Sequence, residues 1–389
     1  MPPALLPGDA VALTRALVAI DSRNPSLAAV GPGEGACARF LERVLHDWGF
    51  RVELQHVAPG RPNVLARIGD TGGPSLLLNG HLDTVGTEGM VHEPWDPVAR
   101  DGRIYGRGSA DMKAGIAAMC AAAWRAAHST PGGLRGEVIV TAVVDEESHS
   151  IGTKAVVDGG VRADAAIVAE PTRLAVCTAH KGFAWADLTV HGTSAHGSRY
   201  DTGVDAITLA AMVIVELDAW QQRELTQRAH PLLGRPSLHA SMIAGGTELS
   251  TYPGECAVQL ERRTIPGEAA AGFGAEIEGA VARVRALHPE LSATVTPGFS
   301  QPPNEVPAAH AIAQCVVAAL TARGRPAPIE GLSCWTDAAI LSAAGIPAIC
   351  FGPGDICAAH SSEESVSIAE IEEASAVLES AIISWCGAH

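Results

Sequence analysis

The chain has 389 residues, of which 47% are hydrophobic and 18% are charged, and its formal net charge is -16. These values are typical of a folded globular protein of two or three domains and exclude an intrinsically disordered chain. The acidic balance and the lack of a basic stripe exclude nucleic acid as a partner, because phosphate binding requires clustered Lys and Arg.

The N-terminal stretch and the cysteines favour a cytoplasmic protein. The first 20 residues have no basic leader and carry Asp9 and Arg15, so they predict an opening helix rather than a secretory signal. Nine scattered cysteines are typical of reduced thiols rather than of a disulfide framework. No uncharged apolar run is long enough to span a membrane, which predicts that no membrane is involved.

The first half of the chain alternates helical and strand patterns. Residues 10–20, 35–48 and 114–127 predict amphipathic or Ala-rich helices. Residues 75–79, 137–144 and 165–169 are short and wholly apolar, which predicts buried strands. Continuous apolar strands between helices indicate a largely parallel sheet that is covered on both faces.

After Lys181 the pattern changes. Residues 183–191 and 256–262 alternate apolar and polar side chains, which predicts strands with one covered face. Helical stretches at 204–217 and 274–287 accompany them, so this part predicts two helices on an antiparallel sheet.

The α/β pattern returns from about Gly298, with helices at 308–321, 337–344 and 368–386 and a strand at 348–351. The simplest fold is an α/β, doubly wound domain (1–181 and 298–389) with an inserted α+β domain (182–297).

Five acidic or histidine-bearing stretches follow predicted strands or open a helix. They carry His81 with Asp83, then Asp111, the pair Glu146 and Glu147, Glu170, and His360. Each of these residues alone could equally be a helix N-cap, a turn residue or a surface side chain with no role in binding. Because ligands in open α/β sheets gather at the carboxyl ends of strands, we expect the five stretches to converge on one crevice. Imidazole and carboxylate oxygens together suit zinc, cobalt or manganese.

Asp83 follows His81 by two residues, which suits its carboxylate to accept the second imidazole N–H and fix the ring.

These stretches resemble the co-catalytic zinc family of acetylornithine deacetylase, succinyl-diaminopimelate desuccinylase, aminoacylase and glutamate carboxypeptidase. The resemblance covers essentially the whole chain. The matching segments are NGHLDTV (79–85), GRGSADMKAG (106–115), VVDEE (143–147), AEPT (169–172), HGTSAHGS (191–198), ERRTIPGE (261–268), TDA (336–338) and AAH (358–360).

The resemblance implies two divalent metal ions, most simply zinc. Asp111 would bridge them, with His81 and Glu170 completing one site and Glu147 and His360 the other. Glu146 would serve as the general base toward the attacking water. The family also implies a cis peptide between Asp111 and Met112.

Further residues enter through the same resemblance. His196 would be an oxyanion donor, often in the neighbouring subunit of a homodimer that the inserted domain forms. Arg263 would pair with a substrate carboxylate, a pairing to which a guanidinium is suited. Gly352 and Gly354 are weaker candidates to offer backbone N–H groups to the same carboxylate.

The expected reaction is hydrolysis of the amide bond of an N-acyl amino acid. A dipeptidase or carboxypeptidase-like activity on the same scaffold is the alternative, and a non-catalytic ligand-binding dimer is a remote one. Two departures from the family pattern, at Tyr200 and at 148–150, lie outside the ligand set, so they bear on the choice of substrate rather than on metal binding.

Overall fold

The computed structural model describes residues 5–28 and 30–387, which form two compact units. The first unit contains the residues up to Thr178, Val306–Glu330 and the residues from Thr336 onward. The second contains Ala179–Glu305 and Gly331–Trp335. It therefore runs past residue 297, because strand β12 (Ser292–Gln301) belongs to its sheet. Each unit has its own hydrophobic core.

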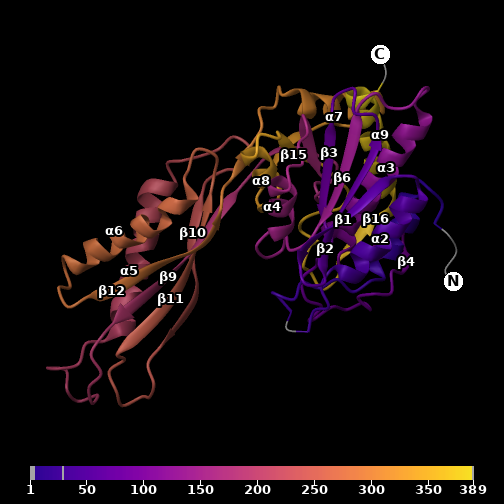
Figure 1. The fold of residues 1–389 in the computed structure, drawn as a ribbon. Coiled ribbons are helices and arrows are strands. Elements are labelled where there is room, and N and C mark those ends of the chain that lie inside the picture. The colour runs from indigo at the N-terminus through magenta and orange to yellow at the C-terminus, as the bar shows by residue number, and fades with distance from the viewer. Residues whose placement is uncertain (1–4, 29, 388–389) are drawn as a thin grey trace. The chain divides into compact units, whose positions relative to one another are not determined.

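A mixed sheet forms the centre of the first unit (Figure 1). Its strands lie in the order β1 (Arg51–Ala58), β2 (Arg61–Gly69), β6 (Glu137–Val143), β3 (Leu76–His81), β7 (Ala165–Val168), β15 (Ala348–Cys350) and β8 (Val176–His180). Strands β6, β3, β7 and β15 run parallel, so their carboxyl ends share one edge. Strands β1, β2 and β8 are antiparallel to their neighbours.

Helices cover both faces of this sheet. Leu76 and Leu78 belong to the core beneath the larger helical layer, while Leu77 between them is equally buried on the other face. Burial on both faces explains why these strands are mostly apolar rather than alternating. The larger layer contains α1 (Ala10–Val18), α2 (Gly35–Asp47), α3 (Ala114–Ser129), α7 (Ala311–Ala322) and α9 (Ile368–Cys386). The smaller layer contains α4 (Ile151–Asp158) and α8 (Ala338–Ala343).

Shorter elements complete the chain. A small sheet has the order β16 (Ser365–Ser367), β5 (Arg103–Tyr105), β4 (Ala99–Arg100), and two short strands, β13 (Asn304–Glu305) and β14 (Ile329–Leu332), pair with β8. Within residues 5–28 and 30–387, no helix combines the length and apolar character needed to cross a bilayer.

The second unit is an antiparallel sheet with helices along one face (Figure 1). Its strand order is β10 (Ser237–Gly245), β11 (Glu255–Thr264), β9 (Gly182–His191), β12, and its helices are α5 (Ala206–Trp220) and α6 (Phe273–Arg285). Leu188 and Val190 of β9 are buried under the helices, whereas Trp185 points to the open face. The predicted fold class, a mostly parallel α/β sheet with an α+β part, is confirmed.

Candidate metal centre

The shared edge of the parallel strands carries most of the predicted ligands. His81 is the last residue of β3, Glu146 and Glu147 follow β6, and Glu170 follows β7. Asp111 lies in the kinked segment η1 (Ser109–Lys113) that leads into α3, where its own backbone is not helical, and its peptide bond to Met112 is cis, as the resemblance implies. His360 lies in the loop between β15 and β16.

Asp111 lies between the two histidines. Its Oδ1 is 3.0 Å from Nε2 of His81, and its Oδ2 is 3.4 Å from Nε2 of His360. Asp111 is 7% exposed and His81 is 1% exposed, whereas half of the His360 side chain is accessible. Each oxygen of this one carboxylate therefore faces a different imidazole.

The acidic pair after β6 adjoins the same two rings. Oε2 of Glu147 is 3.0 Å from Nε2 of His360, and Oε2 of Glu146 is 4.0 Å from Nε2 of His81. Three potential ligand atoms lie within 4.8 Å of one another, one each from His81, Asp111 and Glu147. Imidazole nitrogen and carboxylate oxygen at this spacing suit a divalent transition metal.

Glu170 gives an independent sign that a cation fits here. The residue is 4% exposed, and its Oε1 has no hydrogen-bond partner within the described residues. Burial raises the pKa of Glu146 and Glu170 well above 4.5, and neighbouring carboxylates raise both further. A cluster of buried carboxylates is stabilised in its ionised form by positive charge, which bound divalent ions would provide.

The histidines carry the positive charge when metal is absent. Hydrogen bonds to Asp111 and Glu147 raise the pKa of His360 to about 10. Burial opposes protonation of His81, but its hydrogen bond to Asp111 raises its pKa well above 6.5. Burial likewise opposes ionisation of Asp111, yet both imidazoles lower its pKa. Metal would therefore replace protons on these ligands.

Asp83 makes a different contact from the predicted one. Nδ1 of His81 is hydrogen bonded to the Asp83 backbone carbonyl at 3.0 Å, and the Asp83 carboxylate is farther away, at 3.6 Å. That carboxylate accepts the backbone N–H groups of Glu146 and Glu147, at 3.1 Å each. The hydrogen bond that orients the ring is therefore made by the backbone carbonyl of Asp83, while its carboxylate holds the acidic pair.

Gly352 and Gly354 do not present free backbone N–H groups. The amide of Gly352 donates to Oγ1 of Thr172 at 3.1 Å, and that of Gly354 donates to Glu370 at 2.8 Å. A side chain at Gly352 would meet the carbonyl oxygens of Ala169 and Glu170 at 2.5 and 2.6 Å. Glycine at position 352 lets the chain pass close to the strand end that carries Glu170. The prediction that its N–H binds a substrate carboxylate is therefore corrected.

The remaining predicted residues belong to the second unit, whose placement relative to the first is not determined. His196 is exposed, and its Nδ1 accepts a hydrogen bond from the Ser198 amide at 3.3 Å. Arg263 forms an ion pair with Glu261 and lies 5.6 Å over the ring of Phe183.

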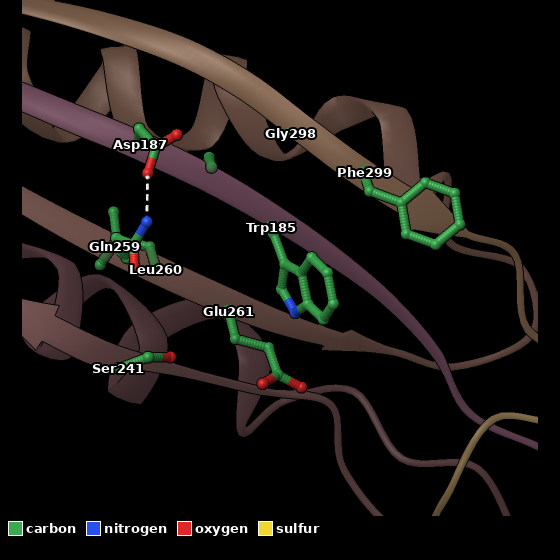
Figure 2. A pocket seen from close by; sticks show the side chains of 9 residues that line it. Trp185, Asp187, Ser241, Gln259, Leu260, Glu261, Gly298 and Phe299 are labelled. Atoms are coloured by element: carbon green, nitrogen blue, oxygen red, sulfur yellow. Dashed lines mark hydrogen bonds between the residues drawn. The ribbon is translucent and has the colours of Figure 1, made fainter. Parts of the chain in front are cut away.

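A cavity of about 490 Å³ opens on the sheet of the second unit (Figure 2). It is lined by Trp185, Ala186, Asp187, Ser241, Gln259, Leu260, Glu261, Gly298 and Phe299. Its two carboxylates are already partnered, because Asp187 accepts from Gln259 at 3.1 Å and Glu261 pairs with Arg263. None of the predicted metal ligands lines this cavity.

Sequence reasoning missed a buried residue that fixes the Asp111 turn. The carboxylate of Glu364 accepts backbone N–H groups from Gly108, Ala110 and Asp111 at 2.9 to 3.1 Å. It also pairs with Arg107 at 2.6 Å. The only sequence feature that could have indicated Glu364 is its position four residues after His360. That position alone does not distinguish it from the neighbouring acidic residues.

Comparison with known proteins places this centre in context. The chain is 29% identical over 373 residues to N-formyl-4-amino-5-aminomethyl-2-methylpyrimidine deformylase of Bacillus subtilis (strain 168), covering 88% of this chain and 87% of the relative. It is 30% identical over 360 residues to acetylornithine deacetylase of Myxococcus xanthus, covering 90% of this chain and 91% of the relative. The crystal structure of aminopeptidase PepT from Bacillus cereus ATCC 10987 is similar in fold, with a TM-score of 0.79, 20% identity and coverage of 96% and 97%.

The model of Peptidase family M20/M25/M40 matches residues 77–384, a span that begins within β3 and reaches α9. This span includes all of the predicted metal ligands. The chain therefore belongs to Peptidase family M20/M25/M40, as its motifs indicated.

Proposed function

We propose that this protein uses two divalent metal ions, most simply zinc, to hydrolyse the amide bond of an N-acyl amino acid. The observation that carries the proposal is the position of Asp111, whose two carboxylate oxygens face two different histidines. A carboxylate between two sets of donors is suited to bridging two ions. His81 and Glu170 would hold one ion, and Glu147 and His360 the other. Such ions supply the Lewis acidity that cleavage of an amide requires.

Glu146 is the proposed general base. It lies beside Nε2 of His81 without a hydrogen bond of its own to that ring, and its side chain is 10% exposed. Its carboxylate takes a proton from the attacking water, and the carbonyl carbon gains the oxygen. The C–N bond then breaks, and the same carboxylate returns the proton to the leaving amine.

His196 is suited to donate to a developing oxyanion. Its Nδ1 lies 2.8 Å from the Ser198 hydroxyl and 3.3 Å from the Ser198 amide, and when Nδ1 accepts from this amide a neutral ring carries its proton on Nε2. Donation to the oxyanion lowers the barrier most when the donor is positioned in advance. We expect it to act within a homodimer, and sedimentation analysis that gave a monomer would remove the role in a neighbouring subunit.

A substrate without a carboxylate is a second candidate, favoured by two observations. The guanidinium of Arg263 is already paired with Glu261, and the amides of Gly352 and Gly354 are hydrogen bonded within the chain. The predicted receptors for a substrate carboxylate are therefore engaged. The similarity to a deformylase that acts on an aminopyrimidine supports including such compounds.

A substrate panel tests the proposal. Amine release is measured from N-acetyl, N-succinyl and N-carbamoyl amino acids, from dipeptides, and from an N-formyl aminomethylpyrimidine, with added zinc or with chelator. Chelator-sensitive turnover of one acyl amino acid class is the expected result. Preference for dipeptides would instead establish a peptidase, and preference for the pyrimidine would establish the second candidate. No turnover of any compound by the metal-loaded protein would contradict the proposed reaction.

A further inference from the structure

A buried ionic cluster lies behind the acidic pair of the metal centre. Arg61, the first residue of β2, donates from Nε and Nη2 to the two oxygens of Glu34, at 2.8 and 2.6 Å. Nη2 also donates to Oδ1 of Asp145 at 2.8 Å. The Glu34 side chain is fully buried, and those of Arg61 and Asp145 are 12% and 3% exposed. A planar guanidinium fork can hold two carboxylates in this way, which a point charge cannot.

Asp145 immediately precedes Glu146 and has a left-handed backbone, with φ of 70°. Every polar group of this residue is used. Its N–H donates to Glu34 at 3.2 Å, and its carbonyl accepts from the amide of Ser150 at 2.6 Å. Its Oδ2 accepts from the amide of His149 at 3.2 Å. The contacts fix the direction in which the chain leaves β6, and hence where the acidic pair begins.

A second connection reaches the acidic pair from the other side. Asn24 is fully buried. Its side-chain nitrogen Nδ2 donates to Oδ1 of Asp145 at 3.1 Å and to Oδ2 of Asp83 at 2.9 Å. Asp83 in turn accepts the backbone N–H groups of Glu146 and Glu147. Arg61 Nη2 also donates to the side-chain oxygen Oδ1 of Asn24 at 3.3 Å. The Arg61 guanidinium therefore contacts Asp145 and Asn24 directly and reaches Asp83 through Asn24.

We infer that Arg61 is a positioning residue, which acts through Asp145, Asn24 and Asp83 to place Glu146 and Glu147 for metal binding and proton transfer. The inference rests on the proposed function and adds to it residues that touch neither metal nor substrate. Residues that orient metal ligands from behind commonly change metal affinity or activity by about 10- to 100-fold when replaced.

The test compares matched variants of one strand. Arg61→Lys keeps the charge but loses the fork, and Arg67→Lys changes the same residue type in β2, where Arg67 pairs with Glu137 at 2.6 Å. Co²⁺ is titrated into metal-free protein and followed by its visible absorption, and kcat and KM are measured at saturating metal. We expect Arg61→Lys to weaken Co²⁺ binding and lower kcat by about 10-fold or more each, with KM within about threefold. Arg67→Lys should behave as the parent protein.

A second pair of variants decides the question if Arg61→Lys does not fold. Asp145→Gly retains the Arg61–Glu34 pair and tolerates the left-handed backbone, but it removes the side-chain link. Asp145→Asn keeps an oxygen that accepts from Arg61 and also tolerates this backbone. We expect Asp145→Gly to show the defect and Asp145→Asn to restore most of the Co²⁺ affinity and kcat.

The inference is overturned if Asp145→Gly and a folded Arg61→Lys bind Co²⁺ and turn over like Arg67→Lys. It is equally overturned if they only lower the melting temperature, because that would be a purely structural role. The Co²⁺ titration needs no substrate. A parent protein that binds metal but hydrolyses nothing would therefore contradict the proposed function while leaving this comparison decisive.

Discussion

Removing metal should make the stability of this protein fall as the pH rises. In the metal-free centre, hydrogen bonds to Asp111 and Glu147 raise the pKa of His360 from 6.5 to about 10. Between these values the folded protein keeps a proton that the unfolded chain releases. The contribution to stability is complete below pH 6.5 and is lost as the pH approaches 10. The raised pKa values of Glu146 and Glu170 act in the same direction above pH 4.5.

The size of the effect follows from the pKa and the exposure of His360. One pKa unit corresponds to about 1.4 kcal/mol, so the whole displacement would correspond to about 5 kcal/mol. The His360 side chain is 51% exposed, and solvent screening of such pairs reduces the contribution to about 1 kcal/mol. At roughly 2–4 °C per kcal/mol, the melting temperature should fall by a few degrees. In metal-loaded protein the imidazole is held neutral, so this slope should disappear.

Thermal unfolding of chelator-treated and zinc-loaded protein between pH 6.5 and 9 measures this slope. His360→Asn should flatten the slope of the metal-free protein. His288→Asn, which removes a contact of 3.4 Å to Glu290 elsewhere, should leave it unchanged. A melting temperature that does not fall with pH in the metal-free protein, or that falls equally with zinc bound, would refute the reasoning.

Three further changes probe the same centre and its support. Glu146→Gln should keep both metals by elemental analysis but lose about 10²- to 10⁴-fold in kcat, and near-normal turnover would remove Glu146 as the base. Asp111→Asn should lower the bound metal toward zero, whereas His360→Asn should retain about one ion per chain; equal metal contents would argue against a bridging Asp111. Gly352→Ala should lose about 1–3 kcal/mol in denaturant unfolding, because its Cβ would meet carbonyl oxygens at 2.5 and 2.6 Å. Gly72→Ala, with nothing within 4 Å of the added atom, is its control, and equal stability of the two variants would contradict the packing argument.

Local patterns in the sequence predicted the central parallel strands and most helices. The runs at 75–79, 137–144 and 165–169 correspond to β3, β6 and β7, whose burial on both faces makes them mostly apolar. Strands β1, β2, β10 and β12 were not predicted. Pro62 lies within β2 and Pro297 within β12, and seven of the nine residues of β10 are exposed. The prolines interrupt the patterns of β2 and β12, and the exposure of β10 hides its covered face. Strand β1 does alternate Val52 and Leu54 with polar residues, a pattern that the sequence prediction missed.

Most candidate ligands stand just after a strand or just before a helix, where position predicts a site, whereas His360 lies in the loop between β15 and β16 and was assigned through the AAH motif (358–360). The residues that support these ligands could not be predicted. Arg61 and Asp145 are 84 positions apart, and Glu364 and Gly108 are 256 apart, so only the folded chain brings these polar groups together. The Asp83 contact was misassigned for a related reason: spacing from His81 does not reveal that the backbone of the acidic pair occupies its carboxylate.

The most direct test of a two-metal hydrolase is stepwise return of zinc to chelator-treated protein, with amine release from the best panel substrate measured at each addition. Asp111 between two histidines predicts two bound equivalents and full turnover only as the second is filled. Turnover that survives complete metal removal, or that reaches its maximum without a second bound ion, would contradict this account.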